Sequence, residues 1–494
     1  MSLSTLRFKS FLFFRRFTPS CPLPSSFFPT VSFKGCHPTR KAMSNPNLHP
    51  TGETCGKSGR LCLGRRNNLP ILLRPKLRIR IVEFENKQVI WLATKAKGDT
   101  RMKSWIRSCF VLGVVLLAPK LWAQDSSRVL VVGDGDPRCA QAMYSRIQDA
   151  INEAPIGAKI HVCAGTYAEV LSITKPLTLT ADEGAILMPQ DVQANGVSLA
   201  SGNPLAALLS VKDTTKVILS GLTVDAAMAG ITECAPDLIG VLYQNASGAI
   251  TGLKVRNTRL ASWLNGCQSG LGIFVQSGNG GRSVVEIRGN QVSGYQKNGI
   301  TANEAGTIVK ISRNTITGVG PTTGAAQNGI QIGYGAEGEI TKNSVSENIW
   351  SPCVSPNQCE WFSTGIAIVE ASSVRVARNA SSHNQVDIFS DGDGCWITLN
   401  YTSGAVVLDG IQIVGDGCIV QNNRVMDSDR AGIAIFGNGT VVRKNEIIDA
   451  PVGILKSSAA VGTDIGPNDF DNVGTEIVDP SPLVLGPFAS NPVR

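Results

Sequence analysis

The sequence predicts an all-β solenoid in which one short coil repeats along an axis. The first observation is a unit, repeated between Gly299 and Ile454, that reads Gly-Ile-x-Ile, a Gly-rich turn, and an apolar strand ending in Asn. The second is the length of this unit, which is about 22 residues where nothing is inserted. The third is an alternation of apolar and polar residues without a helical period, which is typical of short strands.

The two ends of the unit are regular. Its Gly-Ile starts are Gly299, Gly329, Gly365, Gly410, Gly432 and Gly453, with Asp387-Ile388 standing in for one of them. The matching asparagines are Asn314, Asn343, Asn379, Asn400, Asn423 and Asn445. Each start lies 13 to 15 residues before its Asn, so only the segment after the Asn changes length. We expect the Ile pairs to stack inside the solenoid and the Asn side chains to hydrogen-bond between adjacent coils.

Residues 1–123 differ sharply in composition from the rest of the chain. They contain 22 of the 46 Lys and Arg but only four of the 38 Asp and Glu, which leaves residues 124–494 with a net charge of −10. A body this acidic gives no electrostatic reason to bind nucleic acid, whose phosphates must be neutralised by cations. We interpret residues 1–101, which are basic and lack sustained periodicity, as a mispredicted or disordered N-terminal extension.

Residues 102–123 are typical of a signal peptide. A basic start with Lys103 and Arg107 precedes an apolar run and a cleavage position after Ala123. The run is too short to span a membrane comfortably, so we expect a secreted or periplasmic protein without a membrane span after cleavage. An uncleaved anchor or a buried helix is the alternative.

The cysteines agree with export. Eight of the 13 follow the signal peptide, and an even number in an exported chain indicates disulfides. Cys395 and Cys418 are 23 residues apart, which is one coil, and stacked strands lie about 4.8 Å apart, within reach of a disulfide. The other expected pairs are Cys353 with Cys359, Cys139 with Cys163, and Cys234 with Cys267. A metal site is the alternative, although the sequence contains no Cys-x-x-Cys motif.

One short helix is predicted ahead of the first strands. Its apolar positions recur at helical spacing: Ile147, Ala150, Ile151 and Ala154. A helix there would cover the open end of the coil stack, whose backbone is otherwise unpaired. We therefore divide the mature chain into an N-terminal cap with the first coil, the repeats, and a C-terminal cap: residues 124–180, 181–455 and 456–494.

The segment RIQDAINEAPIGAKIHVCAGTYAEVLSITKPLTLTAD resembles the opening of pectin-lyase-like right-handed parallel β-helix proteins. The later coils are similar to the repeats of NosD-like and carbohydrate-active families, and the resemblance extends over nearly all of residues 128–455. It implies a single-stranded right-handed parallel β-helix with a short N-terminal capping helix. It also implies a substrate groove along the Gly-Ile-x-Ile face. The catalytic motifs of polygalacturonases, pectinesterases and pectate lyases are missing, so no catalytic residue is carried over from them.

Two insertions follow the recurring asparagines of neighbouring coils, between Asn314 and Gly329 and between Asn343 and Gly365. We expect them to form a wall beside the Gly-Ile-x-Ile face, where exposed aromatic rings stack on sugars. The predicted binding residues are Asn303, Gln331, Tyr334, Trp350 and Trp361. The alternative for the two tryptophans is that they merely anchor their loop.

Candidate catalytic and metal-binding groups follow from the same register. Glu304 and Glu370 lie five residues past their starts and two coils apart, roughly 10 Å by strand spacing, which is close to the separation in inverting glycosidases. Asp391, Asp393 and Asp416 fall in Gly-rich turns, where stacked oxygens could hold Ca²⁺. The alternatives are solvated turn carboxylates and residues chosen for turn conformation.

The sequence therefore predicts an exported protein that binds a polysaccharide or cell-surface glycan along the Gly-Ile-x-Ile face. A polysaccharide hydrolase or lyase is one alternative, and whether the chain is an enzyme stays open. A structural adhesin or a NosD-like maturation partner is another. We expect no nucleic-acid partner, and Ca²⁺ is the one cofactor for which the sequence gives a reason.

Overall fold

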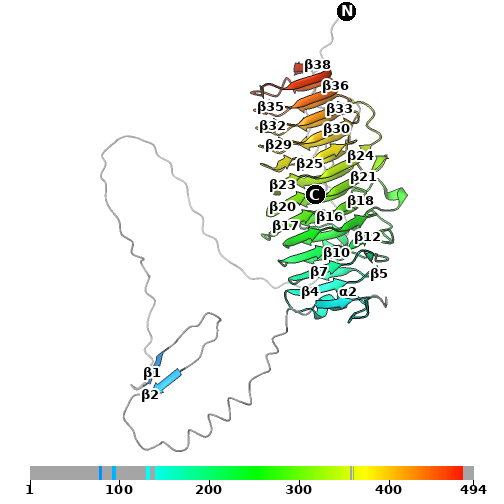
Figure 1. Ribbon diagram of the computed structural model, residues 1–494, viewed down its shortest axis with the longest axis vertical. Coiled ribbons are helices and arrows are strands. Elements are labelled where there is room, and N and C mark those ends of the chain that lie inside the picture. Colours follow the sequence, from blue (N-terminus) through cyan, green and yellow to red (C-terminus); the bar gives the residue numbers. More distant parts are fainter. Residues whose placement is uncertain are drawn as a thin grey trace, which may run out of the picture. The chain divides into compact units, whose positions relative to one another are not determined.

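The computed structural model contains two compact units, residues 1–109 and 110–494. In the first, β1 (Leu77–Arg80) pairs antiparallel with β2 (Leu92–Lys95). The second unit holds the solenoid (Figure 1). The signal peptide and nearly all of the predicted N-terminal extension lie outside the described residues, which are 77–80, 92–95, 129–133, 139–356, 359 and 361–481.

Each coil of the solenoid contributes one strand to each of three parallel series, and consecutive coils stack along the axis (Figure 1). The Gly-Ile series contains β6 (Leu171–Ile173), β10 (Pro204–Lys212), β13 (Asp237–Gln244), β16 (Leu271–Gln276), β19 (Asn298–Asn303), β22 (Asn328–Gly333), β25 (Thr364–Val369), β28 (Val386–Ser390), β31 (Asp409–Ile413) and β34 (Ala431–Ile435). The short β9 (Gly196–Val197) joins β10 antiparallel.

The second series is a 13-stranded sheet, which we call the 13-stranded face. Its strands are β3 (Val129–Val132), β4 (Ala158–Val162), β7 (Leu177–Ala181), β11 (Val217–Ser220), β14 (Gly248–Thr251), β17 (Ser283–Arg288), β20 (Thr307–Ser312), β23 (Glu337–Thr341), β26 (Arg375–Ala377), β29 (Trp396–Thr398), β32 (Ile419–Gln421), β35 (Val441–Arg443) and β37 (Asp464–Ile465).

The third series follows the ladder asparagines. Its strands are β5 (Gly165–Tyr167), β8 (Ala185–Leu187), β12 (Thr223–Asp225), β15 (Lys254–Arg256), β18 (Gln291–Ser293), β21 (Thr315–Thr322), β24 (Ser344–Trp350), β27 (Ala380–Ser382), β30 (Tyr401–Ala405) and β33 (Arg424–Ser428). In the last coils the two long strands β36 (Glu446–Ser457) and β38 (Asp469–Ser481) pair with each other and join the third series to the Gly-Ile series.

The repeated isoleucines form one stack through the interior. Strand pairing puts the first Ile of each Gly-Ile-x-Ile directly above that of the preceding coil, from Ile300 to Ile454. The stacked side chains are fully buried: Ile300, Ile330, Ile366, Ile388, Ile411, Ile433 and Ile454. Burying one such side chain contributes about 1.5–3 kcal/mol, so the repeat gives every coil the same apolar contribution. The predicted all-β parallel β-helix is therefore confirmed.

A ladder of asparagine side chains beside this core crosses the coil boundaries from Asn290 to Asn468. In each step the Oδ1 of one Asn accepts hydrogen bonds from the backbone N–H and the Nδ2 of the Asn one coil earlier. At Asn343 and Asn379 these distances are 2.9 and 3.0 Å, while Asn343 Nδ2 also donates to the Ile311 carbonyl at 3.0 Å. The ladder extends one coil beyond the predicted six at each end, to Asn290 and Asn468.

The predicted N-terminal helix is present as α2 (Ile147–Glu153), packed on the first coil. It buries Ile147, Ala150 and Ile151, the side that the spacing indicated. The carboxylate of Glu169 accepts the backbone N–H groups of Ile147 at 2.6 Å and Gln148 at 3.0 Å. These two N–H groups belong to the first turn of the helix, where N–H groups have no acceptor within the helix. Among the described residues no helix has the length and apolar character needed to cross a membrane.

All four expected disulfides are formed. Three join segments 23 to 33 residues apart in the sequence, namely Cys139–Cys163, Cys234–Cys267 and Cys395–Cys418. The fourth, Cys353–Cys359, closes a small loop inside the longer insertion. Intercoil disulfides restrict the unfolded chain, which in general stabilises a fold by about 2–4 kcal/mol each.

One carboxyl group lies inside the apolar core. Asp387 takes the Gly position of its unit, where a side chain points into the interior, and it is fully buried. Its Oδ1 accepts hydrogen bonds from Asn384 Nδ2 at 2.7 Å and from the Ser381 hydroxyl at 3.3 Å. Burial raises the pKa of the Asp387 carboxyl well above its ordinary value, and these two hydrogen bonds oppose the shift only in part.

We predict that the buried Asp387 makes the stability of the solenoid fall as pH rises. Because its pKa is higher in the folded than in the unfolded state, its penalty is absent below the ordinary Asp value of about 3.9 and grows above that pH. Each unit of pKa difference corresponds to about 1.4 kcal/mol. Asp387→Asn removes the titration, so the variant is expected to be the more stable protein at pH 7.

The measurement is the urea midpoint of both proteins at pH 4 and pH 7. The difference between the two proteins isolates Asp387 from the other carboxyl groups, because those titrate equally in both. A midpoint difference that is the same at both pH values would contradict the prediction.

Candidate functional site

Two cavities of the solenoid lie at the corner where the third series returns to the Gly-Ile series. Four of the coils have long connections at this corner, at residues 226–236, 257–270, 323–327 and 351–363. The Cys234–Cys267 disulfide joins the first two connections, with the two Cα atoms 5.3 Å apart. Long connections here destabilise the coil stack only slightly, because they leave the three strands of each coil unchanged and loop-closure entropy grows slowly with length.

A single tryptophan stands out of this corner. Trp263 belongs to the short 3-10 helix η2 (Ser262–Leu264) and is 75% exposed, the highest value among the large hydrophobic side chains found exposed in the described residues. Gln296, from the next coil, holds the turn in place. Its Oε1 accepts the Leu260 backbone N–H at 3.0 Å, and its Nε2 donates to the carbonyls of Leu264 and Cys267 at 2.8 and 2.9 Å.

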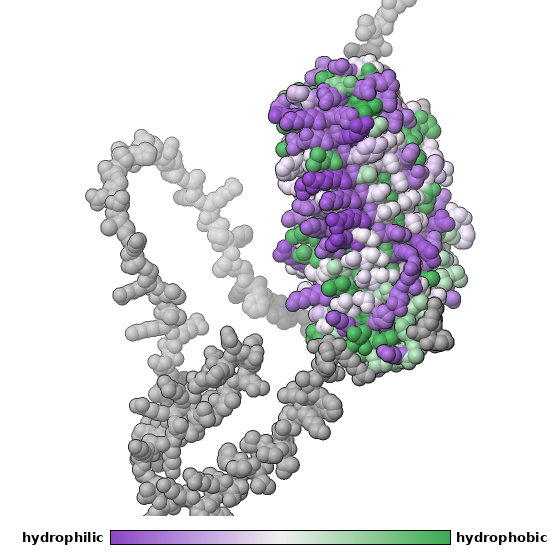
Figure 2. Space-filling view, viewed as in Figure 1, coloured by the Kyte–Doolittle hydropathy of each residue, from purple (hydrophilic) through white to green (hydrophobic). Residues whose placement is uncertain are grey.

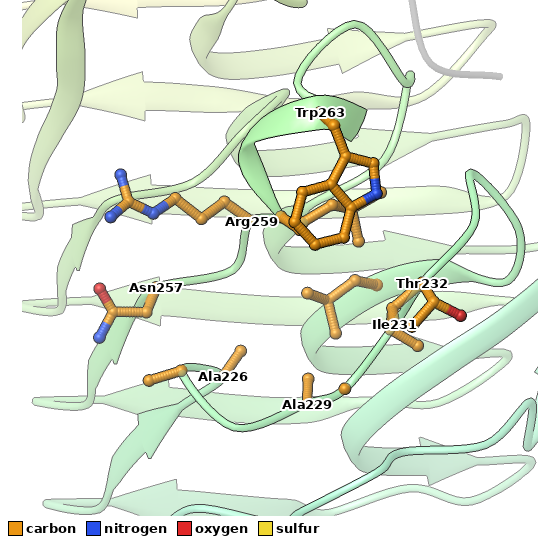
Figure 3. Close-up of a pocket in the computed structure, with 12 residues that line it drawn as sticks. Ala226, Ala229, Ile231, Thr232, Asn257, Arg259 and Trp263 are labelled. Carbon is orange, nitrogen blue, oxygen red and sulfur yellow. The ribbon is translucent and has the colours of Figure 1, made fainter.

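The ring of Trp263 borders a cavity of about 450 Å³. Figure 3 shows Trp263 at one end of this cavity and Ala226 and Ala229 at the other, with Ile231 and Thr232 along one side. Asn257 and Arg259 lie on the opposite side. We call this the Trp263 cavity.

The polar lining of the Trp263 cavity is preorganised by a buried carboxylate. Asp225, only 4% exposed, accepts hydrogen bonds from Asn257 Nδ2 at 2.8 Å and from Arg256 Nε at 2.7 Å. The Arg256 pair neutralises the buried charge, while the Asn257 bond fixes the amide beside the cavity. A fixed side chain loses less entropy when it binds a ligand, so this arrangement favours recognition.

A second cavity of about 460 Å³ adjoins the first and shares Arg259, Leu260 and Ala261 with it. Its remaining lining is largely polar: Ser262, Asn265, Tyr295, Gln296, Val319, Thr322 and Gln327. The turn that carries Trp263 therefore lies between two cavities. Together they offer an indole face, amides, hydroxyls and one guanidinium, which are groups that stack and hydrogen-bond.

The predicted tryptophans of the longer insertion occupy a different environment. Trp350 donates from Nε1 to the Gly324 carbonyl at 3.0 Å and is half-buried. It packs against a cluster that includes Cys353, Phe362 and Phe389, and Trp361 nearby in the sequence is also half-buried. Trp350 thus anchors its loop on the Gly-Ile series, and the binding role predicted for both residues stays a prediction.

Two of the predicted binding residues lie inside a hydrogen-bonded ladder. Asn303 and Gln331 are fully buried, and Gln331 Nε2 donates to Asn303 Oδ1 at 3.0 Å. The same Gln331 accepts from Asn298 Nδ2 at 3.0 Å through its Oε1. These amides connect the adjacent strands β19 and β22 and do not form an open row of binding groups.

Glu304, Tyr334 and Glu370 stand at one position on three successive coils, as the spacing predicted. Each directly follows residues paired in register, and each has a positive φ, 76°, 55° and 48° respectively. The two carboxylates are therefore two coils apart, which corresponds to roughly 10 Å. All three residues take the left-handed conformation that ends the strand, so turn geometry alone accounts for their alignment.

The three candidate calcium ligands interact with the backbone of neighbouring coils. Asp393 Oδ1 accepts the Asp416 N–H at 2.9 Å, and Asp416 Oδ1 accepts the Asn438 N–H at 2.7 Å. Asp391 accepts the Glu370 N–H at 2.5 Å, and burial chiefly, with repulsion from Glu370 and Asp393, raises its pKa to about 6. Calcium binding stays a prediction.

In the described part of the chain, the acidic, Cys and His side chains that converge closely enough for a metal ion are His161, Cys163 and Asp182. Cys163 is bonded to Cys139 in this structure, so its sulfur is not available as a thiolate ligand. The grouping therefore reads as a disulfide beside a His161–Asp182 contact of 3.3 Å.

The sequence pattern did not single out Trp263, because this residue lies before Gly299, where the regular Gly-Ile-x-Ile repeat begins. The signal was present in the segment Ser262-Trp263-Leu264-Asn265-Gly266-Cys267, which interrupts a coil between two strands. The longer insertion has the same pattern, in which an aromatic residue, Trp350, is followed closely by a cysteine, Cys353. The contacts that Gln296 makes with this turn could not be read from the pattern.

Comparison with known proteins supports the architecture. The sequence model of the family described as "Right handed beta helix region" matches residues 271–470. None of the curated proteins matches the chain.

Several solved structures are similar to this chain at low identity. A GH136 lacto-N-biosidase from Eubacterium ramulus is 13% identical with a TM-score of 0.49, over 69% of this chain and 68% of the other. PfbA, a surface adhesin of Streptococcus pneumoniae, is 14% identical with a TM-score of 0.44, over 67% and 87%. A polygalacturonase from Erwinia carotovora is 11% identical with a TM-score of 0.40, over 70% and 96%. These likenesses are too distant to bear on activity. The family match over residues 271–470 and the stacked three-strand coils show that this chain has the fold of a right-handed parallel β-helix.

Proposed function

We propose that this chain is an exported carbohydrate-binding protein whose ligand contacts Trp263. The observation that carries the proposal is the 75% exposed indole that lines a cavity of about 450 Å³, beside a second cavity of about 460 Å³. Exposing a large apolar ring to water is unfavourable, and such rings on concave surfaces are suited to the apolar faces of sugar rings. The neighbouring amides and hydroxyls match the hydroxyl groups of a sugar.

Rigidity of the turn is a second support. Three hydrogen bonds from Gln296, the Cys234–Cys267 disulfide, and a bond from the Ala325 N–H to the Asn265 carbonyl at 2.7 Å hold the loop. A preorganised aromatic platform binds with a smaller entropy cost than a flexible loop does. Because Asn303 and Gln331 are buried, we assign binding to this corner in preference to the Gly-Ile-x-Ile face.

Export is part of the proposal. The four disulfides are of the kind that forms in an oxidising compartment, and they agree with the signal-peptide pattern of residues 102–123. We therefore expect a secreted or periplasmic protein that meets a polysaccharide or cell-surface glycan there.

We predict that Trp263→Ala weakens glycan binding about tenfold, because a stacked aromatic ring contributes about 0.5–1.5 kcal/mol beyond the area that it buries. Binding is measured on a glycan array and then by titration with the best ligand. Trp396→Ala is the matched control, because Trp396 is also exposed, at 46%, but lies on β29 of the 13-stranded face.

Equal binding by the Trp263→Ala variant and the wild type would exclude this site. Failure of the wild-type protein to bind any glycan would favour a structural adhesin or a NosD-like maturation partner. Neither result depends on stability, provided that both variants melt like the wild type.

A polysaccharide hydrolase or lyase is the second candidate function. Two observations favour it: Glu304 and Glu370 share one turn position two coils apart, and the Asp391 carboxyl beside Glu370 has its pKa raised to about 6. A carboxyl group that titrates near 6 can carry a proton close to neutral pH, as a general acid must.

If the chain is such an enzyme, Glu304→Gln or Glu370→Gln is expected to lower the rate by at least a hundredfold, while Glu337→Gln, an exposed carboxylate on β23, leaves it unchanged. A protonated Asp391 would make the rate fall as pH rises above about 6. The assay is a polysaccharide panel with and without Ca²⁺, in which reducing ends and unsaturated ends are measured. The absence of product from every polysaccharide would remove this candidate.

A further inference from the structure

The 13-stranded face carries a cluster of basic residues on an otherwise acidic body. Along the middle of this face, charges of opposite sign alternate from coil to coil in the order Glu286, Lys310, Glu339, Arg375. Arg375 and Glu339 lie 3.8 Å apart. Alternation of this kind stabilises neighbouring strands slightly, and it leaves little net charge.

The turn at the end of these strands carries charges of one sign on three successive coils. Arg313, Lys342 and Arg378 stand directly above one another, since the N–H of Arg313 bonds to the Thr341 carbonyl and that of Lys342 to the Ala377 carbonyl, each at 3.2 Å. Like charges stacked in this way repel. We call these three residues the cationic turn row.

Each member of the cationic turn row also has an unfavourable backbone. The φ angles are 56° at Arg313, 58° at Lys342 and 58° at Arg378, in the left-handed region that Gly or Asn occupies more easily. In an earlier coil this turn position is Gly289, and in a later one it is Asn422, whose φ is 55°. Long basic residues are therefore not required by the turn itself.

A small cavity of about 260 Å³ opens between the row and the strands beside it. Its lining contains two guanidinium groups, two ammonium groups, two hydroxyl groups and one carboxylate: Arg288, Arg313, Lys310, Lys342, Ser312, Thr341 and Glu286. Among the described residues, none of these four cations forms a salt bridge within 4.0 Å. In Figure 2 the side of the solenoid formed by β17, β20 and β23 is strongly hydrophilic.

The donor set determines which ligand fits. Six donor side chains from three adjacent coils surround a space smaller than a typical drug-sized pocket. A carboxylate offers two oxygens, whereas a phosphate group offers three or more and carries up to two charges. Guanidinium groups bind phosphate oxygens in pairs, and lysines add point charge. We propose that this cavity binds the phosphate group of a phosphate-bearing ligand.

The proposed phosphate site is separate from the carbohydrate proposal. It lies at the strand ends of the 13-stranded face, and it shares no lining residue with the Trp263 cavity or with the cavity beside it. Either proposal can fail without the other.

The test uses the full chain and inorganic phosphate as the probe, with heat of binding measured at low and high salt. We expect saturable binding that weakens as salt rises, because the cations are exposed and screened. The double variant Arg313→Asn with Lys342→Asn is expected to bind at least tenfold more weakly. Asn accepts the left-handed turn, so this variant keeps the backbone conformation.

Lys444→Asn is the matched control. Lys444 has a φ of 53° and occupies the same turn position beside ladder residue Asn445, yet it lies outside the cavity. It should bind phosphate like the wild type. The absence of saturable phosphate binding, or equal binding by the double variant and the wild type, would overturn the proposal.

The source of the phosphate is distinguished by two further probes. One is glucose 6-phosphate, and the other is vesicles of phosphatidylcholine with and without phosphatidylglycerol. Binding of the phosphosugar alone identifies a phosphorylated glycan as the ligand class. Retention on the phosphatidylglycerol vesicles alone identifies a lipid headgroup. Either result supports the proposed site if the double variant no longer binds the same probe. Unchanged binding of that probe by the double variant would overturn the proposal.

Discussion

The structure depends on one constraint, which is that every coil must satisfy the backbone of the next. Parallel strands leave a row of N–H and C=O groups at each end of the stack, and a coil that does not match its neighbour in register leaves those groups unpaired. The asparagine ladder extends this matching into the turn, where its amides bond the backbone of one coil and the side chain of another. Sequence and length can therefore vary only at positions outside the paired strands and the asparagine ladder.

Those free positions are where the candidate sites lie. The corner connections between the third and the Gly-Ile series vary in length, and two successive connections build most of the Trp263 cavity. The left-handed turn beside the ladder varies in residue type, and it gives the cationic turn row. In both places residues far apart in sequence meet because the coils are stacked, and in neither place does a change alter the strands.

The fold could be predicted because each coil repeats the same local physics. A period near 22 residues, paired isoleucines and a recurring Asn were enough to predict the stack. Helical spacing ahead of the first strands predicted the capping helix, and the number and spacing of the cysteines predicted the disulfides. Asp387 is the exception, because the repeat shows that it replaces a Gly but gives no reason for the replacement. It occupies a Gly position in the sequence, but only the structure reveals a buried carboxyl group held by Asn384 and Ser381.

Asn303 and Gln331 were predicted as surface groups because alternation assigns them to the outer side of the strand, yet they are buried. Trp263 was missed because its turn is held by Gln296, more than 30 residues later in the chain, and no local pattern encodes that contact.

The connectivity of the coils also determines how the molecule responds to force. If the chain is pulled from its two ends, coils detach one at a time, and each would release about 22 residues, or roughly 75 Å of extended chain. The Cys395–Cys418 disulfide ties one coil to the next, so the residues between these cysteines add nothing to the extension until the bond is reduced. An oxidising environment therefore makes the C-terminal part of the solenoid shorter under load and more resistant to peeling than its hydrogen bonds alone allow.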